Sequence, residues 1–301
     1  MPRMAGVPLR CRRPGFGTCG SHAHGVALKT LALCVDDVGL LAGGAATVVA
    51  LASAGRICAA SCMTTGPHWR GEAAALTRSR DVLGRLELGL HVNLTEGAPL
   101  SADLGRHRPT LPRLPALIVA AHLGRLPLEA VAVELRAQLD AFVDAVGRLP
   151  AFVDGHQHVH HLPGVRERVL KLVAGDDAQR PSMAVRNTGR VLGPGRAVKR
   201  LLIARTGGTA LQKLLERRAV RHNAVLLGVY DFTPHYRGLM RGWLRVAPAA
   251  GGLIFCHPRA GTPACGDSIA AARFHEAAYL ASTAFADDLA EVGVTVGPAW
   301  S

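Results

Sequence analysis

Short apolar runs alternate with longer amphipathic segments along most of this 301-residue chain, and this alternation limits the folds that it can adopt. The apolar runs have the length of β-strands and the segments between them have helical spacing, which is typical of a parallel sheet with helical crossovers. The predicted strands lie near residues 29–35, 58–64, 86–93, 151–156, 183–187, 224–229, 252–256 and 293–296. The predicted helices lie near residues 41–54, 70–83, 127–147, 163–174, 196–219 and 268–291. Seven or eight such strands in one chain favour an α/β fold of the TIM-barrel-like (β/α) barrel type over an open sheet.

The chain shows no linker rich in Gly, Ser or Pro that would divide it, so we expect residues 29–301 to form one barrel domain. Residues 1–28 are basic and rich in Gly, Pro and Arg, and they lack the continuous apolar core of a secretory signal. We expect a disordered extension there, or an upstream stretch added by a misassigned start codon. Residues 97–127 carry several prolines and no clear strand, which predicts an insertion that could serve as a lid. The uncharged stretch 39–55 is rich in Ala and Gly, which favours a buried helix over a membrane span.

The net charge of +13 comes from 35 Lys and Arg residues against 22 Asp and Glu residues, and nearly all of the basic residues are Arg. They are spread along the chain without a recognised nucleic-acid-binding motif, so we expect a solvated basic surface and no nucleic-acid partner. Affinity for anionic lipid or an acidic ligand stays open, with any membrane contact peripheral. Seven cysteines are an odd number without the spacing of a disulfide scaffold, which favours a cytoplasmic location. The sequence is compatible with a homodimer.

Four histidines and an aspartate fall within the eight residues from Asp154 to His161, directly after an apolar run. Neutral imidazole is a common ligand of catalytic metals and the usual proton carrier near neutral pH. A surface cluster is the alternative, but the preceding strand favours the rim of a pocket. The density of imidazoles therefore indicates a metal-dependent enzyme.

Polar residues stand at the carboxyl ends of four predicted strands, namely Asp36 with Asp37, then His91, His156 and His257. In barrel enzymes these strand ends form the active face, so the four groups should meet there. Each group also has an ordinary structural interpretation, because aspartates cap helices and turns and a histidine can lie in a core or end a strand. The convergence of four strands is the stronger indication.

Two imidazoles and one carboxylate form a ligand set that suits Zn²⁺, Co²⁺ or Fe²⁺ and, less well, Mg²⁺. Three protein ligands leave coordination positions open for water, whose pKa such a metal lowers while it polarises a carbonyl oxygen. A second aspartate can take the proton of that water, and a histidine on the opposite side can protonate a leaving amine. These groups together predict the hydrolysis of an amide or an ester.

Four motif segments follow one another in the chain, at Val35–Leu40, Gly89–Gly97, Asp154–His160 and Cys256–Pro258. In their order and spacing they resemble the signatures of the YdjC-like carbohydrate deacetylases, a family that includes chitooligosaccharide deacetylases and hopanoid-biosynthesis-associated proteins. The resemblance implies a (β/α)-barrel enzyme that uses one divalent metal ion, Mg²⁺ or Zn²⁺. It also implies removal of an acetyl group from an N-acetylated amino sugar, with a metal-bound water attacking the amide carbonyl.

The resemblance implies roles for individual residues as well. Asp37, His91 and His156 would be the metal ligands, Asp36 the catalytic base and His257 the acid. Roles in binding the substrate or in orienting these groups would fall to Asn93, Thr95, Asp154, His158, His160 and Arg259.

The chain departs from the family pattern at Val38, where an aromatic residue is usual, at Leu41, where Ser is usual, and at Arg259, where Gly is usual. None of the proposed ligands is missing, so these departures bear on the substrate rather than on activity. Arg259 would either favour an anionic substrate or point to solvent. A chitooligosaccharide and a hopanoid- or glycolipid-linked N-acetylglucosamine both stay open.

Two other functions rank below deacetylation. A metal-dependent phosphoester hydrolase would need more carboxylate ligands than the motifs supply, and a non-catalytic barrel that binds anionic lipid or nucleic acid would require a broken ligand set. Near the carboxyl end of the chain, Asp267, Arg273 and Glu276 are expected to form a structural ion pair.

Overall fold

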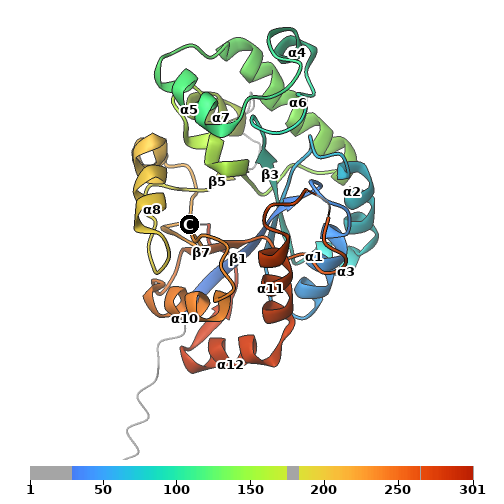
Figure 1. The fold of residues 1–301 in the computed structure, drawn as a ribbon, viewed down its shortest axis with the longest axis vertical. Helices are drawn as coiled ribbons and strands as arrows, with labels where there is room; N and C mark the ends of the chain where they lie inside the picture. The colour runs from blue at the N-terminus through green and yellow to red at the C-terminus, as the bar shows by residue number, and fades with distance from the viewer. Residues whose placement is uncertain (1–28, 175–182, 265, 301) are drawn as a thin grey trace, which may run out of the picture.

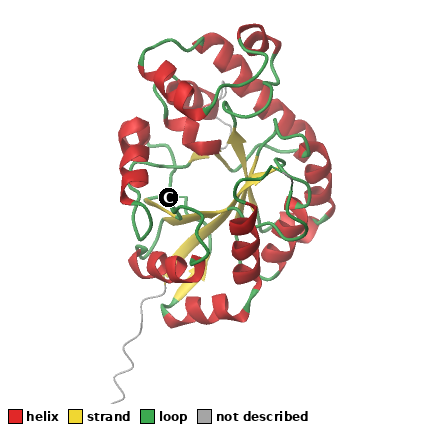
Figure 2. Ribbon diagram, in the orientation of Figure 1, coloured by secondary structure: helices red, strands yellow, loops and turns green. Residues whose placement is uncertain are grey.

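The computed structural model describes residues 29–174, 183–264 and 266–300, so the expectation of a disordered segment over residues 1–28 lies outside the described residues. The described residues form eight parallel strands in the middle of the molecule, with helices around them (Figures 1 and 2). The strands are β1 (Lys29–Val38), β2 (Ala59–Cys62), β3 (Glu87–Val92), β4 (Phe152–Gly155), β5 (Ala184–Val185), β6 (Val225–Leu227), β7 (Gly252–Cys256) and β8 (Val294–Val296). Each strand falls on one predicted from the sequence, and the prediction of a barrel-like (β/α) fold is confirmed.

The strand order is β5-β4-β3-β2-β1-β7-β6, and every strand pair is parallel. The remaining strand, β8, pairs with the first residues of β1, from Lys29 to Leu31. Between β5 and β6 the wall has isolated backbone bridges, Val185 to His222 and Val191 to Leu226, instead of a regular strand pair. Strand pairing is therefore regular along the order from β5 through β1 to β6. It is irregular between β6 and β5, where the barrel closes.

The apolar composition of the strands explains why they lie in the interior of the molecule. Residues 31–35 of β1 are apolar and buried, as expected for a parallel sheet that is covered on its outer side by helices. Gly89 of β3 lies against the ring of Phe152 in β4, and a Cβ atom at Gly89 would stand 2.3 Å from that ring. Glycine at position 89 therefore lets the aromatic ring fill the space beside β3.

The helices mostly fall on the predicted amphipathic segments. They are α1 (Gly44–Ser53), α2 (Trp69–Arg78), α3 (Arg80–Leu83), α4 (Ala102–His107), α5 (Leu114–His122), α6 (Leu128–Val146), α7 (Val165–Ala174), α8 (Ala197–Ile203), α9 (Thr209–Arg217), α10 (Tyr236–Val246), α11 (Ala270–Ala281) and α12 (Thr283–Glu291). The predicted helix at 196–219 is interrupted, because the π-helical turn η2 (Ala204–Gly208) separates α8 from α9. The predicted helix at 268–291 is likewise divided at Ser282.

Two regions contain helices that the sequence did not predict. The proline-containing segment 97–127 holds α4 and α5, and Ser101 caps α4 by accepting a hydrogen bond from the N–H group of Leu104. The helix α10 contains two glycines, yet it buries Tyr236, Met240 and Trp243 at helical spacing. Among the described residues, no helix has both the length and the apolar character that a membrane span requires.

Candidate active site and metal centre

The carboxyl ends of four strands supply polar residues to one cavity of about 660 Å³. The strand β1 provides Asp36 and Asp37, β3 provides His91, and β7 leads into His257. His156 begins the 3₁₀ turn η1 (His156–His161) directly after β4. Asp36, Asp37, His156 and His257 line the cavity, and His91 lies next to Asp37. The structure thus brings together the five residues predicted to be ligands, base and acid.

A β-bulge in β1 explains how two neighbouring aspartates reach the same cavity. Neighbouring side chains of a regular strand point to opposite faces of the sheet. The register between β1 and β2 shifts between Val35 and Val38, so the bulge lies at Asp36 and Asp37. Asp37 has a φ of 65°, a left-handed conformation that Asp tolerates better than most residues. The bulge therefore brings both carboxylates to the cavity.

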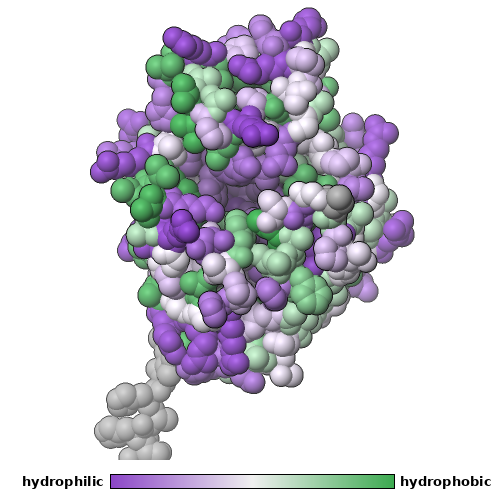
Figure 3. All heavy atoms as spheres, in the orientation of Figure 1, coloured by the Kyte–Doolittle hydropathy of each residue, from purple (hydrophilic) through white to green (hydrophobic). Residues whose placement is uncertain are grey.

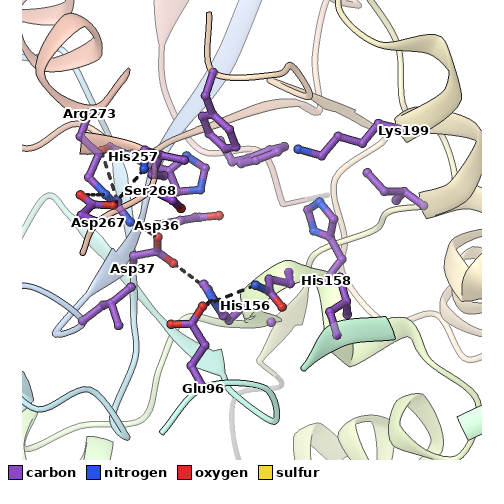
Figure 4. Close-up of a pocket in the computed structure, with 18 of the residues that line it drawn as sticks. Asp36, Asp37, Glu96, His156, His158, Lys199, His257, Asp267, Ser268 and Arg273 are labelled. Atoms are coloured by element: carbon purple, nitrogen blue, oxygen red, sulfur yellow. Dashed lines mark hydrogen bonds and ion pairs between the residues drawn. The ribbon is translucent and has the colours of Figure 1, made fainter. Parts of the chain in front are cut away.

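Asp37, His91 and His156 are buried, and their ligand atoms all lie within 4.8 Å of one another. The Oδ1 atom of Asp37 lies 2.9 Å from Nδ1 of His156 and 3.4 Å from Nε2 of His91. Figure 4 shows Asp37 and His156 facing each other across the floor of the cavity. One carboxylate oxygen and two imidazole nitrogens that converge in this way fit a single divalent metal ion.

The electrostatics of these three residues favour a positive charge between them. Burial alone would raise the pKa of Asp37, but the charge of His156 and hydrogen bonds from both imidazoles hold it well below its usual range. Burial alone would lower the pKa of His91, but the neighbouring carboxylates, Asp154 above all, raise it to about 10. The pKa of His156 is also raised against the effect of burial, mainly by Asp37. Surroundings that stabilise two protonated imidazoles would also stabilise a bound cation.

The imidazole of His91 is oriented from behind by Asp154. Its Nδ1 atom lies 2.7 Å from Oδ1 of Asp154, which leaves Nε2 directed at Asp37. Ser61 donates a hydrogen bond to the same oxygen of Asp154. A carboxylate behind a histidine is the usual arrangement for fixing a metal-binding imidazole.

Charged side chains also hold the other two proposed ligands. Arg273 donates from Nη2 to Oδ2 of Asp37 at 2.8 Å and from Nε to Asp267 at 3.1 Å. The Nε2 atom of His156 lies 3.1 Å from Glu96. The expected ion pair between Asp267 and Arg273 is present, and it extends to Asp37 in the site.

Asp36 is bound by a buried arginine that the sequence did not point to. Arg186, one residue past β5, donates to both carboxylate oxygens of Asp36 and also lies 2.6 Å from Oδ2 of Asp154. Burial alone would raise the pKa of Asp154, but the charges of Arg186 and His91 lower it to about 2. One guanidinium group thus forms ion pairs with two buried carboxylates.

His257 enters the cavity from the end of β7 between aromatic rings. Its ring centroid lies 5.6 Å from those of both Phe232 and Phe255, each in an edge-on arrangement. The backbone N–H group of His257 donates to Glu276, whose other carboxylate oxygen accepts from the hydroxyl of Tyr230. Burial lowers the pKa of His257 to about 4, so its imidazole is neutral at physiological pH.

The remaining predicted site residues divide into two groups. His158 lines the cavity, and Figure 4 shows it across the cavity from Asp37. Asn93, Thr95, Asp154, His160 and Arg259 are not among the cavity-lining residues. His160 is buried and its Nε2 atom lies 2.9 Å from the backbone oxygen of Arg186, while Arg259 donates to the backbone oxygens of Ala42 and Thr262.

Asn93 organises the loop that follows β3. Its Oδ1 atom accepts hydrogen bonds from the backbone N–H groups of Thr95 and Glu96, and its Nδ2 atom donates to Thr65 and to the backbone oxygen of Glu96. These bonds hold Glu96 beside His156. The motif Gly89–Gly97 contained Glu96, but nothing in the motif distinguished it from an ordinary loop carboxylate.

The side walls of the cavity are largely apolar. The helix α5 contributes Leu114 and Ile118, and α8 contributes Leu202 and Ile203. The other apolar lining residues are Leu40, Leu41, Leu162, Phe232, Phe255 and Ile269. The cavity therefore combines a polar floor with walls that suit an apolar group.

Comparison with known proteins agrees with this architecture. In curated sequences, a chitooligosaccharide deacetylase of Enterobacter sp. (strain 638) is 36% identical over 147 residues, which cover 48% of this chain and 56% of that protein. A carbohydrate deacetylase of Homo sapiens is 34% identical over 157 residues, which cover 50% of this chain and 40% of that protein. These matches thus span about half of each protein.

A solved structure from Enterococcus faecalis V583, named a cellobiose-phosphate cleavage protein, has the same fold with a TM-score of 0.66 and 19% identity, and the match covers 90% of this chain and 97% of that one. The family model described as YdjC-like protein matches residues 30–291, which is most of the chain. The chain therefore belongs to the YdjC-like protein family.

Proposed function

We propose that this protein is a divalent-metal-dependent deacetylase that acts on an N-acetylated amino sugar. The observation that carries the proposal is the convergence of Asp37, His91 and His156 at the floor of a cavity that Asp36 and His257 also line. The relatives named chitooligosaccharide deacetylase and carbohydrate deacetylase support the same reaction class.

Asp37, His91 and His156 would hold the metal ion. When bound, a divalent cation in such a site acidifies a water molecule and polarises the carbonyl oxygen of the acetyl group. Two imidazoles and a single carboxylate favour Zn²⁺ over Mg²⁺, because Mg²⁺ prefers oxygen ligands. Arg273 and Asp154 would keep Asp37 and His91 in position, since each lies within hydrogen-bonding distance of its partner.

Asp36 would act as the base. Arg186 fixes both of its oxygens, so the carboxylate has one orientation and stays directed at the cavity. In the proposed reaction Asp36 accepts the proton of the attacking water. Arg186 would keep the carboxylate in place while its charge changes.

His257 would deliver that proton to the departing nitrogen. Its imidazole is neutral before the reaction, so it donates only after it has received the proton that Asp36 took from water. The C–N bond of the amide then breaks, the nitrogen leaves as an amine, and the acetyl group leaves as acetic acid, whose proton passes to the free amine to give acetate and an ammonium group.

The walls of the cavity bear on the choice of sugar. Leu114, Ile118 and Leu202 would contact any group joined to the sugar on the side of α5 and α8. Leu41 adds to this apolar lining at a position where the family usually has Ser. These contacts support an N-acetylated sugar that carries an apolar group, such as a lipid-linked N-acetylglucosamine, over a free chitooligosaccharide.

A cytoplasmic location fits the cysteines. Cys34, Cys58, Cys62 and Cys256 are free thiols among the described residues, as expected in a reducing compartment.

The test is acetate release by purified protein that has been stripped with a chelator and then given Zn²⁺, Mg²⁺ or Co²⁺ separately. The substrates are N,N′-diacetylchitobiose and an alkyl glycoside of N-acetylglucosamine. We expect a metal to restore acetate release, with the alkyl glycoside as the better substrate. Metal binding without acetate release from either sugar would contradict the proposal.

A further inference from the structure

Exposed apolar side chains lie beside the mouth of the cavity, on the two helices that form its walls. Five of them are between 52% and 70% exposed: Val119, Leu123, Val198, Leu201 and Leu202. The first two belong to α5 and the residue after it, and the other three belong to α8. We call these five residues the apolar rim. Figure 3 shows apolar surface over α5 and α8, beside the hollow in this face of the molecule.

The two sequence segments that carry the apolar rim are strongly basic. Residues 104–128, which contain α5, include four arginines and no Asp or Glu. Residues 190–215, which contain α8, include four arginines, two lysines and no Asp or Glu. None of the 22 acidic residues falls in these two segments, and the one acidic partner that α8 meets in the fold is Asp231, which pairs with Arg196 among the described residues.

We propose that the apolar rim and the basic residues around it bind the surface of an anionic lipid bilayer. Exposed aliphatic side chains can enter the boundary between headgroups and acyl chains, while Lys and Arg beside them attract anionic headgroups. Contiguous apolar patches on a protein surface commonly mark a docking site, and an excess of positive charge beside them favours an anionic partner. Lys199 and Arg200 lie between Val198 and Leu201 in the sequence of α8, so both kinds of contact come from one helix.

Docking in this way would turn the cavity mouth toward the membrane. Leu202 and Ile203 belong to the cavity wall, and Leu202 belongs to the apolar rim as well. A bound bilayer would thus be continuous with the apolar wall of the cavity. The inference rests on exposure and charge, and it holds whether or not the floor of the cavity removes acetyl groups.

The test is cosedimentation of the full chain with vesicles made of equal parts phosphatidylcholine and phosphatidylglycerol, and with vesicles of phosphatidylcholine alone. We expect binding to the anionic vesicles, weak binding to the neutral ones, and release at high salt. The double variant Val198→Ser and Leu201→Ser should reduce the bound fraction several-fold. It changes two exposed residues that do not line the cavity, so turnover of a soluble substrate should be unchanged. The matched control is Val133→Ser, an exposed valine on α6, which should bind vesicles like the unchanged protein.

Equal sedimentation of the protein with both kinds of vesicle, or with neither, would overturn the inference. So would undiminished binding by the Val198→Ser, Leu201→Ser variant. A third outcome would also overturn it: the unchanged protein does not bind vesicles and is a dimer in analytical ultracentrifugation, whereas the variant is a monomer. The apolar rim would then be a contact between two copies of the chain. Circular dichroism of the variants confirms that each one folds.

Discussion

Arg186 donates two hydrogen bonds of 2.6 Å to Asp36, one to each carboxylate oxygen. The same guanidinium group lies 2.6 Å from Asp154, which in turn orients His91. One buried cation therefore links the proposed base to the residue behind a proposed metal ligand. A change at Arg186 should affect both at once.

Replacing Arg186 should reduce stability as well as activity. The substitution Arg186→Ala leaves two buried carboxylates without their cation, and we expect a loss of about 3 to 5 kcal/mol in the free energy of unfolding. Arg186→Lys keeps the charge but cannot reproduce the two-pronged contact, so it should retain more stability than Arg186→Ala and still lose turnover. Urea unfolding and acetate release measure the two effects. Arg196→Lys is the control, because Arg196 pairs with Asp231 at the surface. The free energy of unfolding of this variant should differ from that of the unchanged protein by less than about 1 kcal/mol.

Asp154→Asn should weaken metal binding without removing a ligand. The asparagine cannot hold the imidazole of His91 as a carboxylate does, and we expect roughly 10- to 100-fold lower metal affinity. Competition with a metal-sensitive dye measures the affinity. Thr95→Ser, a change in the same region that leaves the ligands and their supports intact, should bind metal like the unchanged protein. Unaltered affinity in Asp154→Asn would show that the contact with His91 has no role in metal binding.

Substitutions of Asp36 and Asp37 should have different effects on turnover and on metal binding. Asp36→Asn should lower the rate of acetate release about 10²- to 10⁴-fold while metal stays bound, because only proton transfer is lost. Asp37→Asn should lose metal as well as turnover, because it removes the only carboxylate in the proposed ligand set. Metal content by elemental analysis and acetate release at saturating substrate separate the two outcomes. Full turnover in Asp36→Asn would remove that residue from the reaction.

Removal of the metal should lower the melting temperature. A metal at about 100 times its dissociation constant stabilises the folded state by about 2.7 kcal/mol if it does not bind the unfolded chain. We therefore expect a chelator to lower the melting temperature and added Zn²⁺ to restore it, as measured by scanning calorimetry. His91→Ala should show little response to either addition.

The contacts of Asp288 on α12 predict that the stability of the protein depends on pH. Hydrogen bonds from Arg237, then from Tyr279 and Arg241, lower the pKa of Asp288 to about 2, against the effect of burial. A carboxylate with a lowered pKa stabilises the folded state above its unfolded pKa, and this contribution disappears as the pH falls through the folded value.

We therefore expect Asp288→Asn to cost about 1 kcal/mol at neutral pH, a figure reduced because both arginines are partly exposed. The difference from the unchanged protein should shrink as the pH falls from about 4 to about 2. Urea unfolding at several pH values measures it. Asp287→Asn, at the exposed neighbouring position, is the control and should show no such trend.

The sequence predicted the strands well, because most of the parallel strands are buried on both faces and read as apolar runs. It also predicted that Asp36, Asp37, His156 and His257 lie at one cavity, since their place at the ends of strands is a local property. The helix α10 was missed although Tyr236, Met240 and Trp243 have helical spacing. Its two glycines and three arginines are interspersed with its apolar residues, so the segment did not indicate a helix.

Arg186 was missed for a different reason. Its partner Asp36 lies 150 residues away in the chain, and no short motif records a contact over that distance. The one local signal was a charged residue in the predicted strand at 183–187, where a buried arginine requires a buried acidic partner. In a chain with so many arginines, that signal was easy to take for a surface residue. The bulge at Asp36 and Asp37 likewise depends on the register between strands, which the sequence of one strand does not specify.

The position of β1 in the sheet has a consequence for the order in which the chain is made. β1 carries Asp36 and Asp37 and is among the first described segments to leave the ribosome, yet it pairs with β7 and β8 near the far end of the chain. Until residues 252–256 and 294–296 have been synthesised, one edge of β1 and the start of the other have no partner. The two aspartates therefore belong to an incomplete sheet for most of translation. The cavity that they line can form only when nearly all of the described chain has left the ribosome.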